Sequence, residues 1–167
     1  IVVSFVMIAM QKPIQGPKVG DIVEQTAKEG GHRLITWGIV RPIGGNVVYC
    51  SEPMIVESTS VGKGGGGKQT TESIYRTYAI GIQEGPITGI RRVWRNNKLV
   101  YDSRDNPWAN ANSSVFLQKV TFYLGDFDQL PDPSIEGIVG VGNVPAMRGT
   151  AYMVMDHEDL TNLGGAL

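Results

Sequence analysis

The sequence is poor in the side chains that most often bind metals or form cross-links, with one cysteine and two histidines in 167 residues. The single cysteine, Cys50, excludes any disulfide within the chain. It lies in a β-rich run, where we expect it to be a small buried side chain. His32 and His157 lie far apart, and His157 is not part of the H-E-x-x-H spacing that brings two zinc ligands to one helix face.

Three aspartates, Asp126, Asp128 and Asp132, are spaced like the start of a calcium-binding loop. That pattern requires Asp or Asn at its fifth position and glycine at its sixth, to provide an oxygen ligand and a sharp turn. Leu130 and Pro131 occupy these two positions. We therefore expect a solvated acidic turn, and no metal or cofactor in the chain.

Neither sign of charge is in clear excess, because 15 basic and 16 acidic residues leave a net charge of 15 − 16 = −1. Nucleic-acid binding requires clustered cations that neutralise phosphates, so we do not expect nucleic acid as the principal partner. The apolar stretch at 1–10 is about half as long as the roughly 20 residues that a membrane-spanning helix needs. We therefore expect no stable membrane insertion of this segment.

No G-x-S-x-G motif is present, so the sequence offers no nucleophile elbow of a serine hydrolase. One glycine-rich run does meet the first part of a nucleotide-binding P-loop: Gly62, Lys63, Gly64, Gly65, Gly66, Gly67 and Lys68. A P-loop continues with Ser or Thr and then a helix, whereas Gln69 follows here and the next residues alternate like a strand. We expect a flexible loop at 58–73, with nucleotide binding as the less favoured alternative.

Glycine is the abundant residue, at 22 of 167, or about 13% against an average near 7%. Glycine and proline are the poorest helix formers, so this composition argues against a helix bundle. Hydrophobic residues make up 41% of the chain, which is enough to build a core. The chain is therefore expected to be globular and rich in turns.

Alternating apolar residues predict strands joined by Gly, Pro and Asn turns. The predicted strands cover about 21–27, 34–41, 46–57, 74–82, 115–124 and 149–155, with a turn at 44–46 and a polar loop at 103–114. Asp132 as N-cap, Pro133 at the first helical position and Glu136 nearby predict one short helix. The expected fold is mainly β: an antiparallel barrel-like or sandwich-like module, or modules, with long loops and one or two short helical turns.

Two segments around Asn96-Asn97 predict a β-hairpin, because asparagine tolerates the positive φ angles of a tight turn. The hairpin is basic, with four cations within eight residues: Arg91, Arg92, Arg95 and Lys98. Strand alternation places Arg91 and Arg95 on one face and Arg92 on the other. This division suits ion pairs between proteins or subunits better than a single phosphate-binding face.

Several longer phrases resemble the central hub, or tail-tip, proteins of long-tailed bacteriophages and gene transfer agents. The phrases run from Tyr78 to Trp94, Asn97 to Asp102, Phe122 to Glu136 and Val144 to Met155, and residues from Gly16 to Tyr49 are similar to the family's opening domain. Asn97 stands where the family usually has glycine, and it still permits a turn. The resemblance covers about residues 16–165 in consistent order.

The resemblance implies a trimeric structural protein, not an enzyme, that closes the tail tube at the tip of the virion and organises attachment and DNA exit. Implied partners are two further copies, the distal tail protein, other tail-tip proteins and the tape-measure protein, with DNA only as transit cargo. Because such proteins are longer, we expect this chain to be an N-terminal fragment, with an apolar segment at 1–15 and the β-rich part at 16–167.

Contacts between subunits are the expected role of the charged residues. Candidates are the basic hairpin residues, Arg91, Arg92, Arg95 and Lys98, and an acidic stretch on the next subunit, Asp126, Asp128, Asp132 and Glu136. The alternative function is a tail-associated cell-wall hydrolase domain, in which Glu84, Asp126 or Glu136 would act as the acid.

Overall fold

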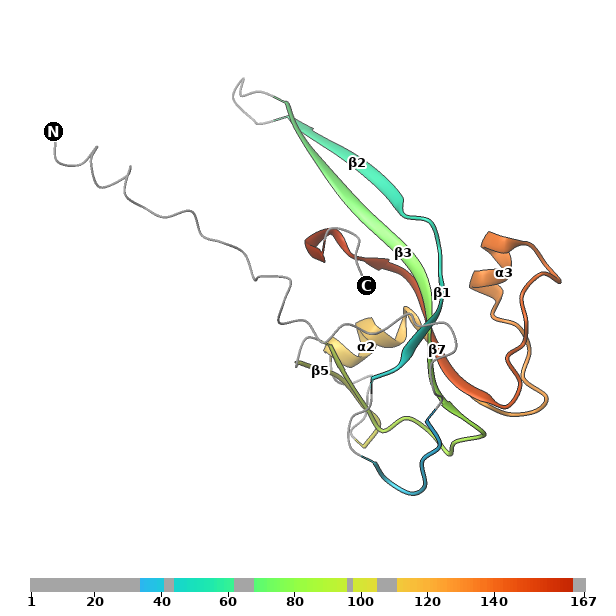
Figure 1. The fold of residues 1–167 in the computed structure, drawn as a ribbon. Helices are drawn as coiled ribbons and strands as arrows, with labels where there is room; N and C mark the ends of the chain where they lie inside the picture. Colours follow the sequence, from blue (N-terminus) through green and yellow to red (C-terminus); the bar gives the residue numbers. More distant parts are fainter. Residues whose placement is uncertain (1–33, 41–43, 62–67, 96–97, 105–110, 164–167) are drawn as a thin grey trace, which may run out of the picture.

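The structure, a computed structural model, describes residues 34–40, 44–61, 68–95, 98–104 and 111–163 (Figure 1). Its elements, in chain order, are β1 (Asn46–Cys50), β2 (Met54–Val61), β3 (Lys68–Glu84), β4 (Arg92–Arg95), β5 (Lys98–Asp102), α2 (Ala111–Leu117), β6 (Val120–Leu124), α3 (Pro133–Val139), β7 (Thr150–Asp159) and the 3-10 turn η2 (Thr161–Leu163). All strand pairs are antiparallel, which confirms the expected mainly β class. None of the helices in these ranges has the length and apolar character needed to cross a membrane.

The 17-residue strand β3 organises the main sheet. On one edge it pairs first with β1, through Val47↔Ile80, and then with β2, through Met54↔Tyr75. On its other edge it pairs with β7, which in turn pairs with β6. The predicted strand at 46–57 is therefore two strands, interrupted just before Met54 by a proline that has no N–H to donate to a ladder.

The part of β3 that pairs with β2 extends beyond the rest of the sheet, and Figure 1 shows these two strands projecting together. We call this ribbon, residues 54–61 paired with 68–75, the arm. It corrects the prediction of a flexible loop at 58–73, because 58–61 and 68–73 form strand. The polar residues of 57–60 and 69–73 favour a loop, but backbone pairing between two strands does not require apolar side chains. The glycine-rich run at 62–67 lies outside the described residues.

Both faces of the sheet centre are covered, which differs from the half-buried strand predicted at 74–82. Residues 77 to 80 of β3 are all buried. On the face toward α3, the α3 side, the core contains Ala79, Ile135, Val144, Tyr152 and Val154. On the opposite face, the α2 side, it contains Tyr78, Ile80 and Met155, packed by Phe116, Val120 and Met153. Figure 1 shows the two helices on opposite sides of the strands.

Helix α2 corrects two predictions, the polar loop at 103–114 and the start of the strand at 115–124. Ser113, Phe116 and Leu117 have the i, i+3, i+4 spacing of one helix face, and the buried Ser113 allows close packing. The Phe116 ring lies 6.1 Å from that of Tyr101 in β5 and 6.3 Å from that of Phe122 in β6. Packing of this aromatic ring therefore stabilises a helix whose Asn and Ser residues have low helix propensity.

The predicted strand at 34–41 is also wrong over 34–40, which forms no strand. Gly38 has a φ of 72°, in the left-handed region that interrupts an extended chain. Before this bend, the Leu34 carbonyl accepts a hydrogen bond of 2.9 Å from the Glu84 N–H, and the Thr36 hydroxyl contacts the Gln83 side chain. The predicted strand at 21–27 lies outside the described residues.

Helix α3 begins as the sequence predicts. The Asp132 side chain accepts a hydrogen bond of 2.9 Å from the Ile135 N–H, and Pro133 occupies the first turn. The other carboxylate oxygen accepts a 2.9 Å hydrogen bond from the Tyr123 hydroxyl in β6. Asp132 is 1% exposed, so this one side chain both caps the helix and attaches it to the sheet.

We expect Asp132→Ala to lower the free energy of unfolding by about 2 kcal/mol, measured by urea denaturation. Loss of an N-cap costs about 1 kcal/mol, and the Tyr123 hydroxyl would lose its acceptor at a further cost of about 1 kcal/mol. Asp132→Asn is the matched control, because its amide oxygen can still cap the helix. A loss below about 0.5 kcal/mol in the alanine variant would contradict this role.

Candidate functional site

Two of the four predicted cations of the basic hairpin form ion pairs within this chain. The guanidinium of Arg92 lies 2.9 Å from the carboxylate of Asp102 on β5, and Arg95 forms an ion pair with Glu158 on β7. Arg91 and Lys98 are exposed, and neither forms an ion pair within the described ranges. Arg92 therefore joins the two strands of the hairpin, and Arg95 attaches the hairpin to β7, while Arg91 and Lys98 stay available to other molecules.

Asp102 carries a second cation as well. Arg104 contacts its carboxylate at 2.6 Å, close to Arg92, and Asp102 is 6% exposed. Hydrogen bonds from Arg104, and then from Arg92, hold the pKa of Asp102 well below its usual range. The carboxylate therefore stays ionised at neutral pH and joins β5 to β4 through its ion pair with Arg92.

Glu158 is the buried acid of the α2 side, at 4% exposure. Its carboxylate accepts a hydrogen bond from the Tyr78 hydroxyl and also forms the ion pair with Arg95. Burial, and then the neighbouring negative charge of Glu158, raise the pKa of Tyr78 far above its ordinary value. This arrangement joins three strands, β3, β4 and β7, through one carboxylate.

An extra residue in β7 brings Glu158 to this position. Arg76 pairs with Glu158 and Tyr78 pairs with Met155, so two steps along β3 match three along β7. His157 lies in this bulge with a positive φ of 45°. As a result Glu158 faces the same side of the sheet as Tyr78 and Met155, which is the side of the hairpin.

The buried tyrosines predict a loss of stability in alkaline solution. Burial, and then the charge of Asp132, raise the pKa of Tyr152 to about 12, and the pKa of Tyr78 is raised further. Because the folded chain favours the neutral phenol, its stability is unaffected below about pH 10 and falls as the pH rises above it. We expect the midpoint of thermal unfolding to drop above about pH 10, and the phenolate absorbance of the folded chain to rise at a higher pH than that of free tyrosine. Titration of all tyrosines near pH 10 in the folded chain would contradict this expectation.

The acidic stretch is divided by its environment. Asp126 and Asp128 are exposed in the turn after β6, whereas Asp132 is buried as the helix cap and so is not available on the surface. The Glu136 carboxylate accepts a 3.2 Å hydrogen bond from a backbone N–H beyond α3. Glu84 is exposed at the end of β3. Within the part of the chain that the structure describes, no three His, Cys, Asp or Glu side chains cluster as a metal site would require.

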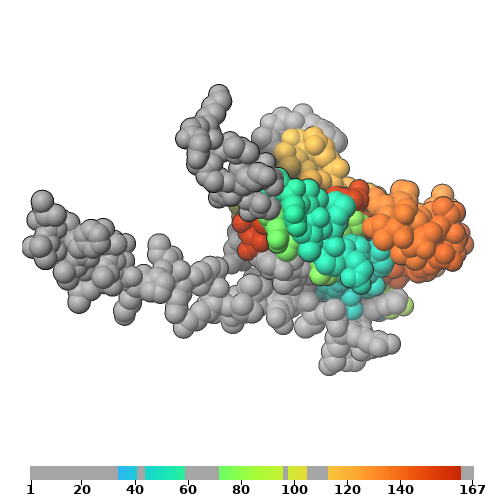
Figure 2. Space-filling view, turned by 90° about the horizontal axis from the view of Figure 1, so that it is seen from above, coloured from blue at the N-terminus to red at the C-terminus, as the bar shows by residue number. Residues whose placement is uncertain are grey.

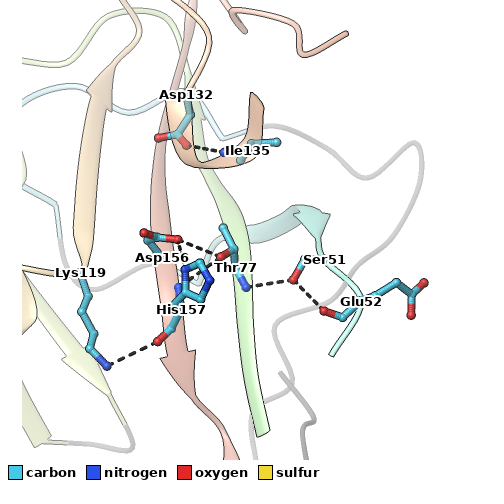
Figure 3. A network of polar contacts seen from close by, with 8 residues as sticks. All are labelled: Ser51, Glu52, Thr77, Lys119, Asp132, Ile135, Asp156 and His157. Atoms are coloured by element: carbon cyan, nitrogen blue, oxygen red, sulfur yellow. Dashed lines mark hydrogen bonds and ion pairs between the residues drawn. The ribbon is translucent and has the colours of Figure 1, made fainter. Parts of the chain in front are cut away.

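Next to the arm, side chains add to the backbone hydrogen bonds between the strands, as Figure 3 shows. The Ser51 hydroxyl, between β1 and β2, accepts a 3.0 Å hydrogen bond from the Thr77 N–H. The Thr77 hydroxyl donates to Asp156 at 3.0 Å and accepts from the His157 N–H at 3.1 Å. Lys119 donates to the carbonyl of His157 at 3.4 Å. These contacts fix the direction in which the arm projects.

A cavity of about 270 Å³ lies on the α2 side of the sheet. Its lining includes three cations, Arg95, Lys98 and Lys119, and the apolar side chains of Val100, Val115 and Phe116, together with Met155, Glu158 and Asp159. We call it the basic groove. A smaller cavity of about 230 Å³, near the origin of the arm, is lined in part by Met54, Tyr75 and Ile138.

The arm presents apolar side chains to solvent. Met54, Ile55 and Val56 are 45%, 57% and 43% exposed, three consecutive residues of one edge strand. Figure 2, seen from above, shows β2 uncovered at the surface with α3 beside it. Two glutamates, Glu57 and Glu72, lie directly opposite each other on the arm and are exposed.

These arm residues were missed in the sequence, although a signal is present. Every paired position of the arm is equidistant from the centre of the 62–67 run, so the two flanks could have been aligned as a hairpin. Glu158 was missed because the bulge before it breaks the simple alternation of β7.

The fold and its exposed surfaces define a mainly antiparallel β module with a projecting two-stranded arm. No family model matches the chain, and no curated protein matches it. Among solved structures, a chain from the virion of a native gene transfer agent particle is similar, with a TM-score of 0.56 and 23% sequence identity. The match covers 92% of this chain and 29% of that one, so this chain spans less than a third of the length of its structural neighbour. The likeness shows that this chain shares its fold with part of that chain.

Proposed function

We propose that this chain is a structural component of a virion, and that its place is the tail tip or baseplate hub of a phage or gene transfer agent particle. The observation that carries this proposal is the fold shared with a gene transfer agent virion chain over 92% of this chain. The phrases from Tyr78 to Trp94 and from Phe122 to Glu136 support the finer assignment, because they resemble the hub family in sequence.

In this role the chain works by assembly and not by catalysis. Three copies would close the end of the tail tube and contact the distal tail protein, other tail-tip proteins and the tape-measure protein, while DNA passes through as cargo. A cyclic trimer requires that one patch meet a different patch on the next copy. The exposed arm and the basic groove are two such different patches on one chain.

Labelling of intact particles tests the proposed location. Gold-conjugated antibodies raised against this chain are expected to bind only at the distal end of the tail in electron micrographs. Particles from a strain that lacks the coding sequence serve as the control, and these are expected to show no label and no completed tip. Label on the capsid, or along the whole tail, would overturn the proposal.

A further inference from the structure

The arm carries a like-charge pair for which the described residues provide no ion-pair partner. Glu57 on β2 and Glu72 on β3 are direct partners in the ladder, so their side chains lie on the same side of the ribbon. Like charges directly opposite each other are destabilising in an antiparallel pair. Both residues are exposed, and over the described ranges neither forms an ion pair. An external cation would relieve this repulsion.

The same side of the arm also presents apolar surface. Ile55 is two residues from Glu57 and pairs with Ile74, which is two residues from Glu72, so all four side chains share one side of the ribbon. Ile55 is 57% exposed. The surface to be covered is therefore two isoleucines followed by two carboxylates.

The basic groove has the complementary composition. Lys98 and Lys119 line it without forming an ion pair inside the described part of the chain. Lys119 donates to a carbonyl at 3.4 Å, and its charge also acts on Asp159, which lines the same groove. Its third cation, Arg95, is already neutralised by Glu158. Val115 in the same lining is 59% exposed. With Asp159 counted against the two lysines, the groove still keeps a positive charge beside an exposed valine, which matches the carboxylates and the exposed Ile55 of the arm.

The arm continues beyond the pairing of β3 with β7. The last rung between β3 and β7 is Tyr75↔Asp159, and Asp159 already lines the groove. Glu72 lies three residues beyond that rung, on a ribbon that projects away from the sheet in Figure 1. This placement favours another molecule as the partner of the arm.

We propose that the arm of one copy docks in the basic groove of a second copy, with Glu57 and Glu72 meeting Lys98 and Lys119 and with Ile55 packing on Val115. Arm and groove are different patches, so the contact is heterologous, which is the kind of contact that the proposed cyclic trimer requires. The number of copies in the ring, three, is taken from the proposed function, and this inference rests on it. The arm is a better partner for the groove than the acidic turn, because Asp132 is buried and only Asp126 and Asp128 remain free there.

Charge reversal in the full chain tests the docking. We expect the double variant Glu57→Lys, Glu72→Lys and the double variant Lys98→Glu, Lys119→Glu each to weaken self-association on the order of a hundredfold, because like charges then meet. The quadruple variant restores opposite charges and is expected to regain the wild-type mass. The readout is sedimentation equilibrium over a concentration series, with circular dichroism to confirm that each variant is folded.

A matched control comes from the acidic turn. Asp126→Lys, Asp128→Lys reverses the same number of charges outside the arm and is expected to leave the mass unchanged. If this control dissociated the oligomer and the arm variants did not, the acidic turn would be the partner of the groove, and the proposal would be overturned. A wild-type chain that stays monomeric throughout, or a quadruple variant that does not recover, would also overturn it. If the gold label lies at the tail tip and the arm variants keep the wild-type mass, the docking is rejected and the tail-tip role stands. If the label lies elsewhere and the quadruple variant regains the wild-type mass, the tail-tip role is rejected and the docking stands.

Discussion

Replacing Tyr152 with alanine is expected to lower the free energy of unfolding by about 3–5 kcal/mol, the largest effect of any single substitution proposed for this chain. Tyr152 is 1% exposed in the middle of β7 and packs in the same cluster as Ile135 and Val154. Its ring stacks on that of Tyr123 at 4.4 Å between centroids. Truncation would leave a cavity beneath α3 that the rigid sheet cannot close. Equilibrium urea unfolding measures the loss.

Tyr152→Phe is the control for this prediction, because it keeps the ring and removes only the hydroxyl. We expect it to cost less than about 1 kcal/mol. If the alanine variant lost no more than the phenylalanine variant, the α3 side of the sheet could not be the main core.

Replacing Glu158 with alanine is expected to have the second largest effect, about 2–3 kcal/mol. Removing one partner of a buried ion pair leaves the others uncompensated, and here the Tyr78 hydroxyl would be buried without its acceptor. The estimate lies below the usual range for buried pairs because the Arg95 side chain is 44% exposed and can be solvated. Unfolding by urea measures the total cost.

The hairpin provides a second readout for the same substitution. Since Arg95–Glu158 attaches β4 to β7, amide hydrogen exchange in β4 and β5 should accelerate more than in β3. Arg95→Ala is the matched variant and should accelerate the same amides at a smaller stability cost. Unchanged exchange in the hairpin of both variants would show that the Arg95–Glu158 ion pair does not stabilise the hairpin.

Sequence patterns succeeded where the structure is decided by neighbouring residues. The Asp132 cap and Pro133 predict α3 because capping uses only the first turn of the helix. The strands on both sides of Asn96-Asn97 were predicted for the same reason, although the turn itself lies outside the described residues. Period-two alternation likewise located the centre of β3.

Sequence patterns failed where the local structure depends on contacts with residues that are distant in the sequence. Helix α2 depends on the packing of Phe116 against two other strands, which no local pattern contains. The arm resembles a loop in sequence because polar residues occur both in loops and in solvent-exposed strands. Of the candidate contact residues, only Arg91, Lys98, Asp126 and Asp128 proved to be both exposed and without an ion pair in the described ranges. The arm glutamates required the strand register to be known.

The bulge in β7 has a consequence for how this strand tolerates changes in length. Before it, even-numbered residues such as Tyr152 and Val154 face α3; after it, an even-numbered residue, Glu158, faces the hairpin. If His157 were deleted, uninterrupted pairing would still place the glutamate opposite Arg76. Two strand lengths thus give one arrangement of side chains, so relatives that are one codon shorter at this point are expected to keep the same core and the same buried acid.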